Sequence, residues 1–377
     1  MILAVSAFGG PQAHMAMLFD LMVDKRRYLD EKELIELHAL CQILPGPTST
    51  QTITAIGFKI GGPNLAYLTL LIWILPAVSI MTLAGIGIWY LEKNNIALDF
   101  ARYIQPMAIG FVAYAAFKIT RKVVKSKTGG ALMIASAFIS FFQSSPYIFP
   151  VMLLVGGGIT AFKFSKHDIE EKEPLKIDWR NFVLWAGVFI FAAILGAVTK
   201  VRLILLFENF YRNGSLIFGG GQVLIPLLLT EFTTLKDYLS QDEFLTGFAL
   251  MQALPGPVFS FSAFIGSISM NNYGVMAQVL GGLVAAIGIF LPGTFLIFFI
   301  IRIWDGLKKF RIVKASLEGI NAVSSGMVIA AVFILFKPLD VDVVNLSLVV
   351  GTFSVLMFTK IPAPFLILAG LLAGIFI

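Results

Sequence analysis

The stretch CQILPGPTSTQ, residues 41–51, interrupts an apolar region with two prolines that flank a glycine. Proline lacks a backbone N–H and clashes with the preceding helical turn, so a regular helix cannot continue through Pro45, Gly46 and Pro47. Four side chains that can form hydrogen bonds follow directly, at residues 48–51. A second stretch, MQALPGPVFSF at residues 251–261, contains the same break. The sequence therefore predicts two helices that are each interrupted inside an apolar segment.

The composition indicates the class of protein that contains these breaks. Of the 377 residues, 58% are hydrophobic and 13% are charged, whereas a soluble domain carries about 25% charged residues. The apolar runs are continuous and do not alternate with polar residues, which argues against a β-barrel. We therefore expect an all-α polytopic membrane protein.

Cysteine, histidine and net charge limit the chemistry. Cys41 is the only cysteine, which excludes an internal disulfide, and the three histidines lack the spacing of a metal site. We expect no metal and no cofactor. The net charge of +6 comes from basic residues in loops beside apolar segments, which is typical of membrane proteins and does not indicate nucleic-acid binding. No removable signal is expected at the N-terminus.

The two breaks belong to an internal repeat. Residues 8–47 align without gaps on residues 218–257, and 15 of the 40 pairs are identical, where composition alone would give roughly three. The identities include FGG at residues 8–10 and 218–220 and both Pro-Gly-Pro sequences. We predict an N-terminal transporter repeat at residues 1–162 and a C-terminal repeat at residues 201–377. Residues 163–200 form a polar linker and an extra apolar segment.

The apolar segments of the two halves run in parallel. Each Pro-Gly-Pro is flanked by segments of about 11–13 residues, too short to cross a bilayer alone. Longer segments follow, with Pro76 and Pro292 inside them. The expected pairs of helical segments are 34–44 with 244–254, 48–60 with 258–270, 64–91 with 274–301, 103–120 with 315–336, and 131–142/147–162 with 343–358/361–377, and 182–199 is unpaired.

Loop charges predict how the halves are oriented. Residues 118–127 carry five basic side chains, whereas the equivalent loop of the second half carries Lys337 with Asp340 and Asp342. The basic cluster of the second half lies at residues 302–314 instead. By the positive-inside rule, equivalent loops lie on opposite faces and the repeat is inverted. If every apolar segment crosses, the number of spans contradicts inversion, so either one segment does not cross or the repeat is not inverted.

A helix that begins inside a membrane is an anion site. Its first N–H groups lack partners and its N-terminus carries about half a positive charge, so it binds an anion without lysine or arginine. Proline suits the first position of such a helix, which predicts that role for Pro47 and Pro257. Vicinal glycines allow close approach to a backbone. The expected substrate-binding residues are Gly9, Gly10, Gln12, His14, Gln42, Gly46, Thr48, Ser49, Thr50, Gly219, Gly220, Gln222, Gln252, Gly256 and Ser260.

Each candidate also has a structural interpretation. The breaks can be kinks for packing, and residues 48–50 can cap a helix. Gln42 and Gln252 can join helices by hydrogen bonds, and His14 can be a buried neutral histidine in place of a proton carrier. Lys59 is expected to complement a helix C-terminus. Glu208 and Arg212 are expected to pair with each other.

The residues of both breaks resemble a known family, the chromate ion transporters. The matching sequences are FGGPQAH, ALCQILPGPTSTQ and IGFKIGG in the first half, and FGGGQVLIPLL and ALMQALPGPVFSFSAFIG in the second. The resemblance covers both halves and is similar to the long two-domain form. It implies efflux of chromate, with sulfate as an analogue, across the inner (cytoplasmic) membrane of a bacterium or archaeon. It also implies an ion gradient as driving force, with a proton or another ion coupled.

Two other functions remain open at this point. A passive anion channel, or a transporter of sulfate or another oxyanion, would use the same site. A membrane enzyme would need a nucleophile with its base, paired carboxylates or metal ligands, and the spans offer no such set. We therefore expect a transporter and not an enzyme. The expected partners are the oxyanion and the lipid bilayer, and the glycine runs at residues 156–158 and 281–282 permit a homodimer.

Overall fold

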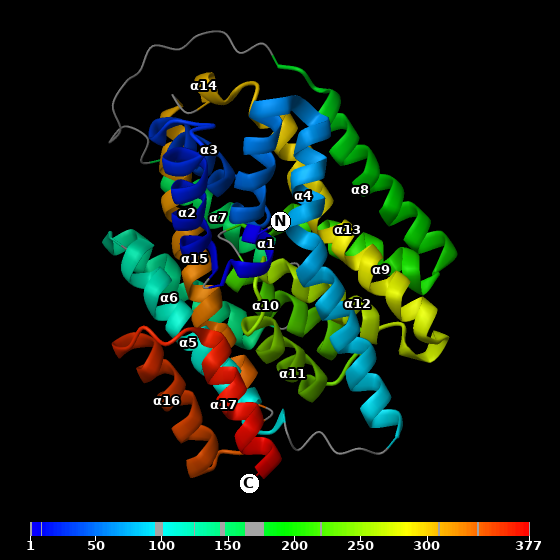
Figure 1. The fold of residues 1–377 in the computed structure, drawn as a ribbon. Helices are drawn as coiled ribbons and strands as arrows, with labels where there is room; N and C mark the ends of the chain where they lie inside the picture. Colours follow the sequence, from blue (N-terminus) through cyan, green and yellow to red (C-terminus); the bar gives the residue numbers. More distant parts are fainter. Residues whose placement is uncertain are drawn as a thin grey trace. The chain divides into compact units, whose positions relative to one another are not determined.

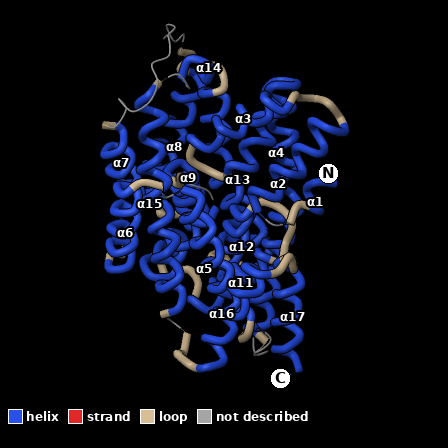
Figure 2. The backbone as a smooth tube through the Cα atoms, turned by 90° about the vertical axis from the view of Figure 1, so that its left-hand side faces the viewer, coloured by secondary structure: helices blue, strands red, loops and turns tan. Residues whose placement is uncertain are grey.

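The structure is a computed structural model that describes residues 2–8, 10–94, 101–123, 125–143, 148–162, 177–218, 221–307, 310–337 and 339–376. Within these ranges the regular elements are all helices (Figures 1 and 2). The first half contains α1 (Ile2–Ser6), α2 (Gly10–Leu18), η1 (Phe19–Lys25), α3 (Glu31–Ile43), α4 (Thr48–Lys93), α5 (Ile104–Val123), α6 (Lys127–Phe142) and α7 (Ile148–Ala161).

The second half has a similar order after one extra helix, α8, but its counterpart of α4 is divided into shorter elements. It contains α8 (Arg180–Thr199), α9 (Arg202–Leu216), α10 (Gly221–Leu229), η4 (Thr230–Leu235), α11 (Gln241–Gln252), η5 (Val258–Ser260), α12 (Phe261–Ile268), η6 (Asn271–Tyr273), α13 (Val275–Ile300), α14 (Trp304–Leu307), α15 (Arg311–Phe336), α16 (Val343–Phe358) and α17 (Ala363–Phe376).

The helices are apolar enough for a membrane protein, as the composition predicts. Four of them can cross a bilayer by length and hydropathy within the described residues: Thr48–Lys93, Arg180–Thr199, Val275–Ile300 and Ala315–Phe336. Along α8, large apolar side chains such as Phe191 and Val198 are exposed. A helix that is apolar on its exposed side is stable in lipid and not in water. The all-α membrane class is confirmed.

The segments expected at 48–60 and 64–91 form one helix with a kink. The backbone leaves the helical region at Gly61 and Gly62, and Gly62 has a φ of +71°. Pro63 follows, where a preceding helical residue is disfavoured. The kink therefore lies at the boundary that the sequence predicts, although α4 continues on both sides of it.

Local structure repeats between the halves. α3 begins with a capping box in which the Asp30 side chain accepts from the N–H of Glu33, and α11 begins with the same box from Ser240 and Glu243. A π-helical segment precedes each box, and a left-handed residue follows each segment, at Arg27 (φ +53°) and Asp237 (φ +51°). Since these pairs keep the spacing of the sequence repeat, the duplicated sequences fold alike here.

The chain divides into two compact units, and each combines segments of both halves. The first unit contains Met1–Trp89, Glu173–Gly221 and Leu254–Leu307. The second contains Tyr90–Lys172, Gln222–Ala253 and Lys308–Ile377.

Small residues bring helices together within the first unit. α13 packs against α8, α9 and α12. The backbones of Gly266 in α12 and Gly281 in α13 are in such close contact that a side chain on either would collide with the carbonyl of the other. Gly282 likewise accommodates Thr82 of α4. The glycines of α13 thus serve packing inside this unit.

The second unit is built around α15, which packs against α5, α6 and α7, while α5 also contacts α11, α16 and α17. Gly319 of α15 lies directly against the carbonyl of Gly156 in α7. Thr160 donates to the carbonyl of Ser316 at 3.4 Å and accepts from the N–H of Gly319 at 3.0 Å. Gly156 therefore also packs within its own unit.

Candidate functional site

The first Pro-Gly-Pro separates α3 from α4 in the first unit. α3 ends at Ile43, α4 begins at Thr48, and Pro45, Gly46 and Pro47 between them are buried. Gly46 has a φ of +116°, which is accessible to glycine and rarely to other residues. The carbonyl of Pro47 accepts the first bond of α4, from the N–H of Gln51 at 2.8 Å. Pro47 is therefore the N-cap, one residue before the position expected for it.

The second Pro-Gly-Pro lies in the same unit and has the same backbone. Gly256 has a φ of +115°, and a Cβ there would lie 2.9 Å from the Cβ of Ala77. The 3-10 turn η5 follows, and α12 continues from it. Pro257 is the N-cap of η5.

Each break forms one backbone hydrogen bond to the other half, and the two bonds are equivalent. The N–H of Gly46 donates to the carbonyl of Ile217 at 2.7 Å, and the N–H of Gly256 donates to the carbonyl of Ala7 at 3.0 Å. Ala7 and Ile217 each precede an FGG sequence directly. Each Pro-Gly-Pro of one half is thus bonded to the residue before the FGG of the other half. Both Pro-Gly-Pro sequences, Ala7 and Ile217 therefore lie in one unit.

The first turn of α4, residues 48–51, carries unpaired backbone donors. The N–H groups of Thr48, Ser49 and Thr50 have no acceptor within the described part of the chain. Ser49 and Thr50 are buried at 3% and 2% exposure. Thr48 is half-buried. Three unpaired donors at the positive end of a long helix attract an anion.

His14 of α2 supports this turn. Its Nε2 lies 3.0 Å from the carbonyl of Ala7, and its Nδ1 lies 3.0 Å from Oγ of Ser49. A carbonyl can only accept, so Nε2 carries the hydrogen and the Ser49 hydroxyl donates to Nδ1. His14 therefore has both ring nitrogens paired in its neutral form, which fits the structural interpretation of this residue.

Trp73 packs beside His14 and binds the next hydroxyl. Its ring meets the imidazole edge to face at 5.1 Å, and its Nε1–H donates to Oγ1 of Thr50 at 3.2 Å. The Ser49 hydroxyl is thus bonded to His14 of α2, and the Thr50 hydroxyl to Trp73, which follows the kink in α4. They do not cap their own helix, which the sequence left open.

The Gln51 side chain folds back over the first turn of α4 toward the Pro-Gly-Pro. Its Nε2–H donates to the carbonyl of Pro45 at 2.6 Å, and its Oε1 has no donor within the described residues. The side chain is 2% exposed. The sequence marked Gln51 as one of four polar residues, but only the fold reveals its unpaired oxygen.

Gln42 is exposed on α3 and reaches the turn indirectly. Its amide lies 3.0 Å from Nε2 of His38, whose Nδ1 lies 3.2 Å from Oγ1 of Thr52. Thr52 in turn donates to the carbonyl of Thr48 at 2.8 Å. Gln42 thus lies at the exposed end of a chain of hydrogen bonds that reaches Thr48 through His38 and Thr52.

The second break offers fewer donors. The N–H of Ser260 donates to the carbonyl of Pro257 at 2.9 Å, and Phe259 occupies the position equivalent to Ser49. Leu224 occupies the position equivalent to His14. The buried Ser260 is therefore part of a tightened turn, and the polar support of the first break has no counterpart here.

The structure describes the other candidates only in part. Gly9, Gly219 and Gly220 lie outside the described residues. Gly10 begins α2 and Gly221 begins α10, and only the backbone of Gln12 and Gln222 is described in these helices. Gln252 ends α11 in the second unit, where it is half-buried.

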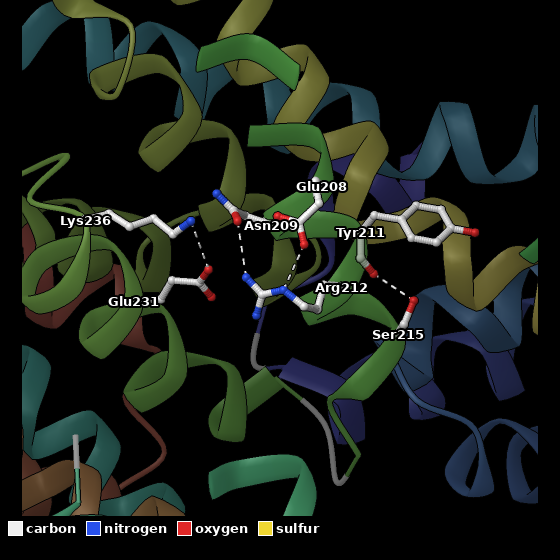
Figure 3. Close-up of polar contacts among 7 residues, drawn as sticks. All are labelled: Glu208, Asn209, Tyr211, Arg212, Ser215, Glu231 and Lys236. Atoms are coloured by element: carbon white, nitrogen blue, oxygen red, sulfur yellow. Dashed lines mark hydrogen bonds and ion pairs between the residues drawn. The ribbon is translucent and has the colours of Figure 1, made fainter. Parts of the chain in front are cut away.

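Arg212 and Lys59 each form an ion pair, and only the first of these pairs was expected. Arg212 donates to Glu208 at 3.0 Å and to Oδ1 of Asn209 at 3.2 Å, as Figure 3 shows, which confirms the pair predicted from the sequence. No helix ends at Lys59, because α4 kinks at Gly61 and Gly62 but continues to Lys93. Lys59 donates to Glu33 at 2.6 Å. This bond, together with one from the N–H of Asp30, holds the pKa of the Glu33 carboxyl below its usual value.

Comparison with known proteins places the chain among transporters. Residues 1–162 and 204–375 match the chromate transporter family. The chain is 26% identical to an uncharacterised transporter of Methanocaldococcus jannaschii over 99% of this chain and 91% of that protein. It is 26% identical to a probable chromate transport protein of Synechococcus elongatus (99% and 92% covered) and to a chromate transport protein of Pseudomonas aeruginosa (85% and 76%). No solved structure matches the chain.

Proposed function

Because the chain belongs to the chromate transporter family, we propose that it is a secondary active transporter that exports chromate across the inner (cytoplasmic) membrane. Sulfate is the close analogue, and a proton or another ion supplies the gradient. The oxyanion binds at the first turn of α4. The remaining candidate residues, in the FGG sequences and at the second break, complete the path through the protein.

The observation that carries this proposal is the set of three unpaired N–H groups at Thr48, Ser49 and Thr50, on one half-buried and two buried residues. A helix N-terminus supplies about half a positive charge. Hydrogen bonds from neutral donors therefore bind a tetrahedral anion less tightly than a lysine or arginine would. A carrier needs this balance, because a substrate that binds too tightly is not released.

The paired bonds Gly46–Ile217 and Gly256–Ala7 support a pseudo-two-fold relation between the repeats, and the loop charges favour the inverted form of it. Two repeats, residues 1–162 and 201–377, related by a pseudo-two-fold axis in the membrane plane would exchange equivalent bonds of this kind. Alternating access then follows from movement of one group of helices against another around the breaks. The homodimer permitted by the glycine runs gains no support, because Gly156 and Gly281 pack within their own units.

Flux into proteoliposomes tests the proposal. Purified protein is reconstituted with chromate on one side, and an imposed proton or ion gradient should drive chromate uphill. Passive flux that follows the membrane potential but never moves uphill would identify a channel. Absence of any chromate or sulfate movement would refute the proposed function.

A further inference from the structure

The Gln51 side chain presents a buried acceptor that the proposed function does not use. Its Nε2–H donates to the carbonyl of Pro45 at 2.6 Å. Because a carbonyl cannot donate, this bond fixes the orientation of the amide, and Oε1 must be the other atom. Oε1 is buried and lacks a donor within the described residues. A buried polar atom without a partner destabilises a protein unless a ligand or water completes it.

The amide lies at the same end of α4 as the three free N–H groups. Side chains of a helix tilt toward its N-terminus, and the Gln51 side chain extends back past the first turn to Pro45. A Cβ on Gly46 or on Gly293 would lie 2.9 Å or 2.7 Å from Nε2, so both glycines leave room for the amide. The helix N-terminus therefore combines three donors with one acceptor.

This combination does not suit a fully ionised oxyanion. Every oxygen of such a dianion is an acceptor, and one placed beside Oε1 would be repelled. A cation would suit Oε1 but not the three N–H groups or the positive helix end. An oxyanion that carries one O–H suits both, since its hydroxyl donates to Oε1 while its other oxygens accept from the N–H groups.

We propose that the first turn of α4 selects singly protonated tetrahedral oxyanions, and that Gln51 Oε1 accepts a hydrogen bond from their hydroxyl group. The inference rests on the proposed function and narrows its substrate class. Chromate takes up a proton near neutral pH, whereas sulfate and selenate do so only in strong acid. Charge and shape alone do not separate these anions, but an acceptor for an O–H does.

The titratable groups beside the turn are His14 from α2, bonded to Ser49, and His38 and the buried Cys41 from α3, both near Thr52. Protonation of either histidine would strengthen binding of every oxyanion. Selenate, which matches chromate in shape and charge, therefore serves as the internal reference for such effects.

The test is the ratio of chromate to selenate affinity, measured by equilibrium binding to the purified full chain between pH 8 and pH 6. While the pH stays above the pKa of an acid, its protonated fraction rises about tenfold for each unit by which the pH falls. The ratio should therefore rise by about tenfold or more from pH 8 to pH 6. In Gln51→Met, which keeps the length of the side chain and removes the acceptor, the ratio should stay constant. Gln143→Met, an exposed glutamine of the second unit, should behave like the wild type.

The outcomes separate the inference from the proposed function. A constant ratio in the wild type, with both anions bound, would overturn the inference and leave the proposed function intact. If the ratio of chromate to selenate affinity still rises in Gln51→Met, Gln51 is not the acceptor that selects the protonated anion. Absence of binding by either anion would refute both. If Gln51→Met does not fold, the wild-type ratio still decides whether the protonated form is selected.

Discussion

The N–H of Gly46 donates to the carbonyl of Ile217 at 2.7 Å, which ties the first Pro-Gly-Pro to the start of the second FGG sequence. The equivalent bond ties Gly256 to Ala7 at 3.0 Å. Ala7 also accepts from His14, which in turn accepts from Ser49 at the first turn of α4. The geometry of the candidate anion site thus depends on bonds between the two halves of the sequence.

Gly46→Ala should weaken both the fold and transport. Its φ of +116° strains any other residue by about 1–3 kcal/mol, and its Cβ would lie 2.9 Å from the Gln51 amide. Thermal unfolding in detergent and chromate flux measure the two effects. The control is Gly87→Ala in α4, where a Cβ meets nothing within 4 Å. Equal behaviour of the two variants would show that the left-handed turn is dispensable.

The bond between His14 and Ser49 should appear as coupling in a double-mutant cycle. Ser49→Ala leaves a buried ring nitrogen without its donor, and His14→Ala removes the acceptor, each at a cost of about 1–3 kcal/mol. The double variant should lose less than the sum of the singles, with a coupling of about 0.5–3 kcal/mol in the free energy of unfolding. Additive losses would contradict the hydrogen bond.

Lys59→Met should lower stability at neutral pH and should matter less in acid. Folding lowers the pKa of Glu33 from its ordinary 4.5, chiefly through the bond from Lys59. The stability from this pair is therefore present above the unfolded-state pKa and is lost as the pH falls through the folded-state pKa. Because both side chains are more than one-third exposed, the effect will be small.

Unfolding midpoints of wild type and Lys59→Met, compared from pH 7 down to pH 3, measure this effect. The difference should shrink below pH 4.5. Lys25→Met removes a lysine from the more exposed pair with Asp20 and provides the matched control. A difference that is independent of pH would mean that Lys59 acts by packing and not through Glu33.

Gly319→Ala should disrupt the second unit. A Cβ there would collide with the carbonyl of Gly156 and with Thr160, so α7 and α15 would have to move apart. Such overpacking costs about 1–3 kcal/mol, seen as a lower unfolding midpoint. The control is Gly158→Ala, which lies in the same glycine run as Gly156 in α7. A Cβ there meets nothing within 4 Å, so this variant should be tolerated.

The inverted topology predicts the sidedness of two loops. Cysteines placed at Lys125 and Lys309 should both react with impermeant reagents from the cytoplasm. Cys41 is buried and gives little background. Reaction from opposite sides would exclude the inverted repeat while leaving the site at α4 unaffected.

Local signals in the sequence predict the helices well. The prolines at residues 45 and 47 end α3 and start α4, and the segments expected at 131–142 and 343–358 correspond to α6 and α16. Proline and glycine act on their own backbone, so their effect is visible without the fold. The capping boxes at Asp30 and Ser240 follow the same logic, because they need only residues three apart.

The contacts that make the site could not be predicted in this way. Gly46 and Ile217, or Trp73 and Thr50, are distant in sequence, and no local pattern indicates that they meet. The unpaired Oε1 of Gln51 depends on where Pro45 and Gly293 lie around it. Such features arise from packing, whereas the sequence indicates only that polar groups follow the break.

A substrate-bound structure tests the central claim most directly. Cryo-electron microscopy of the purified protein with chromate should show density within hydrogen-bond distance of the N–H groups of Thr48, Ser49 and Thr50. Density elsewhere, with these three N–H groups bonded to the protein's own atoms, would contradict the anion site at the start of α4.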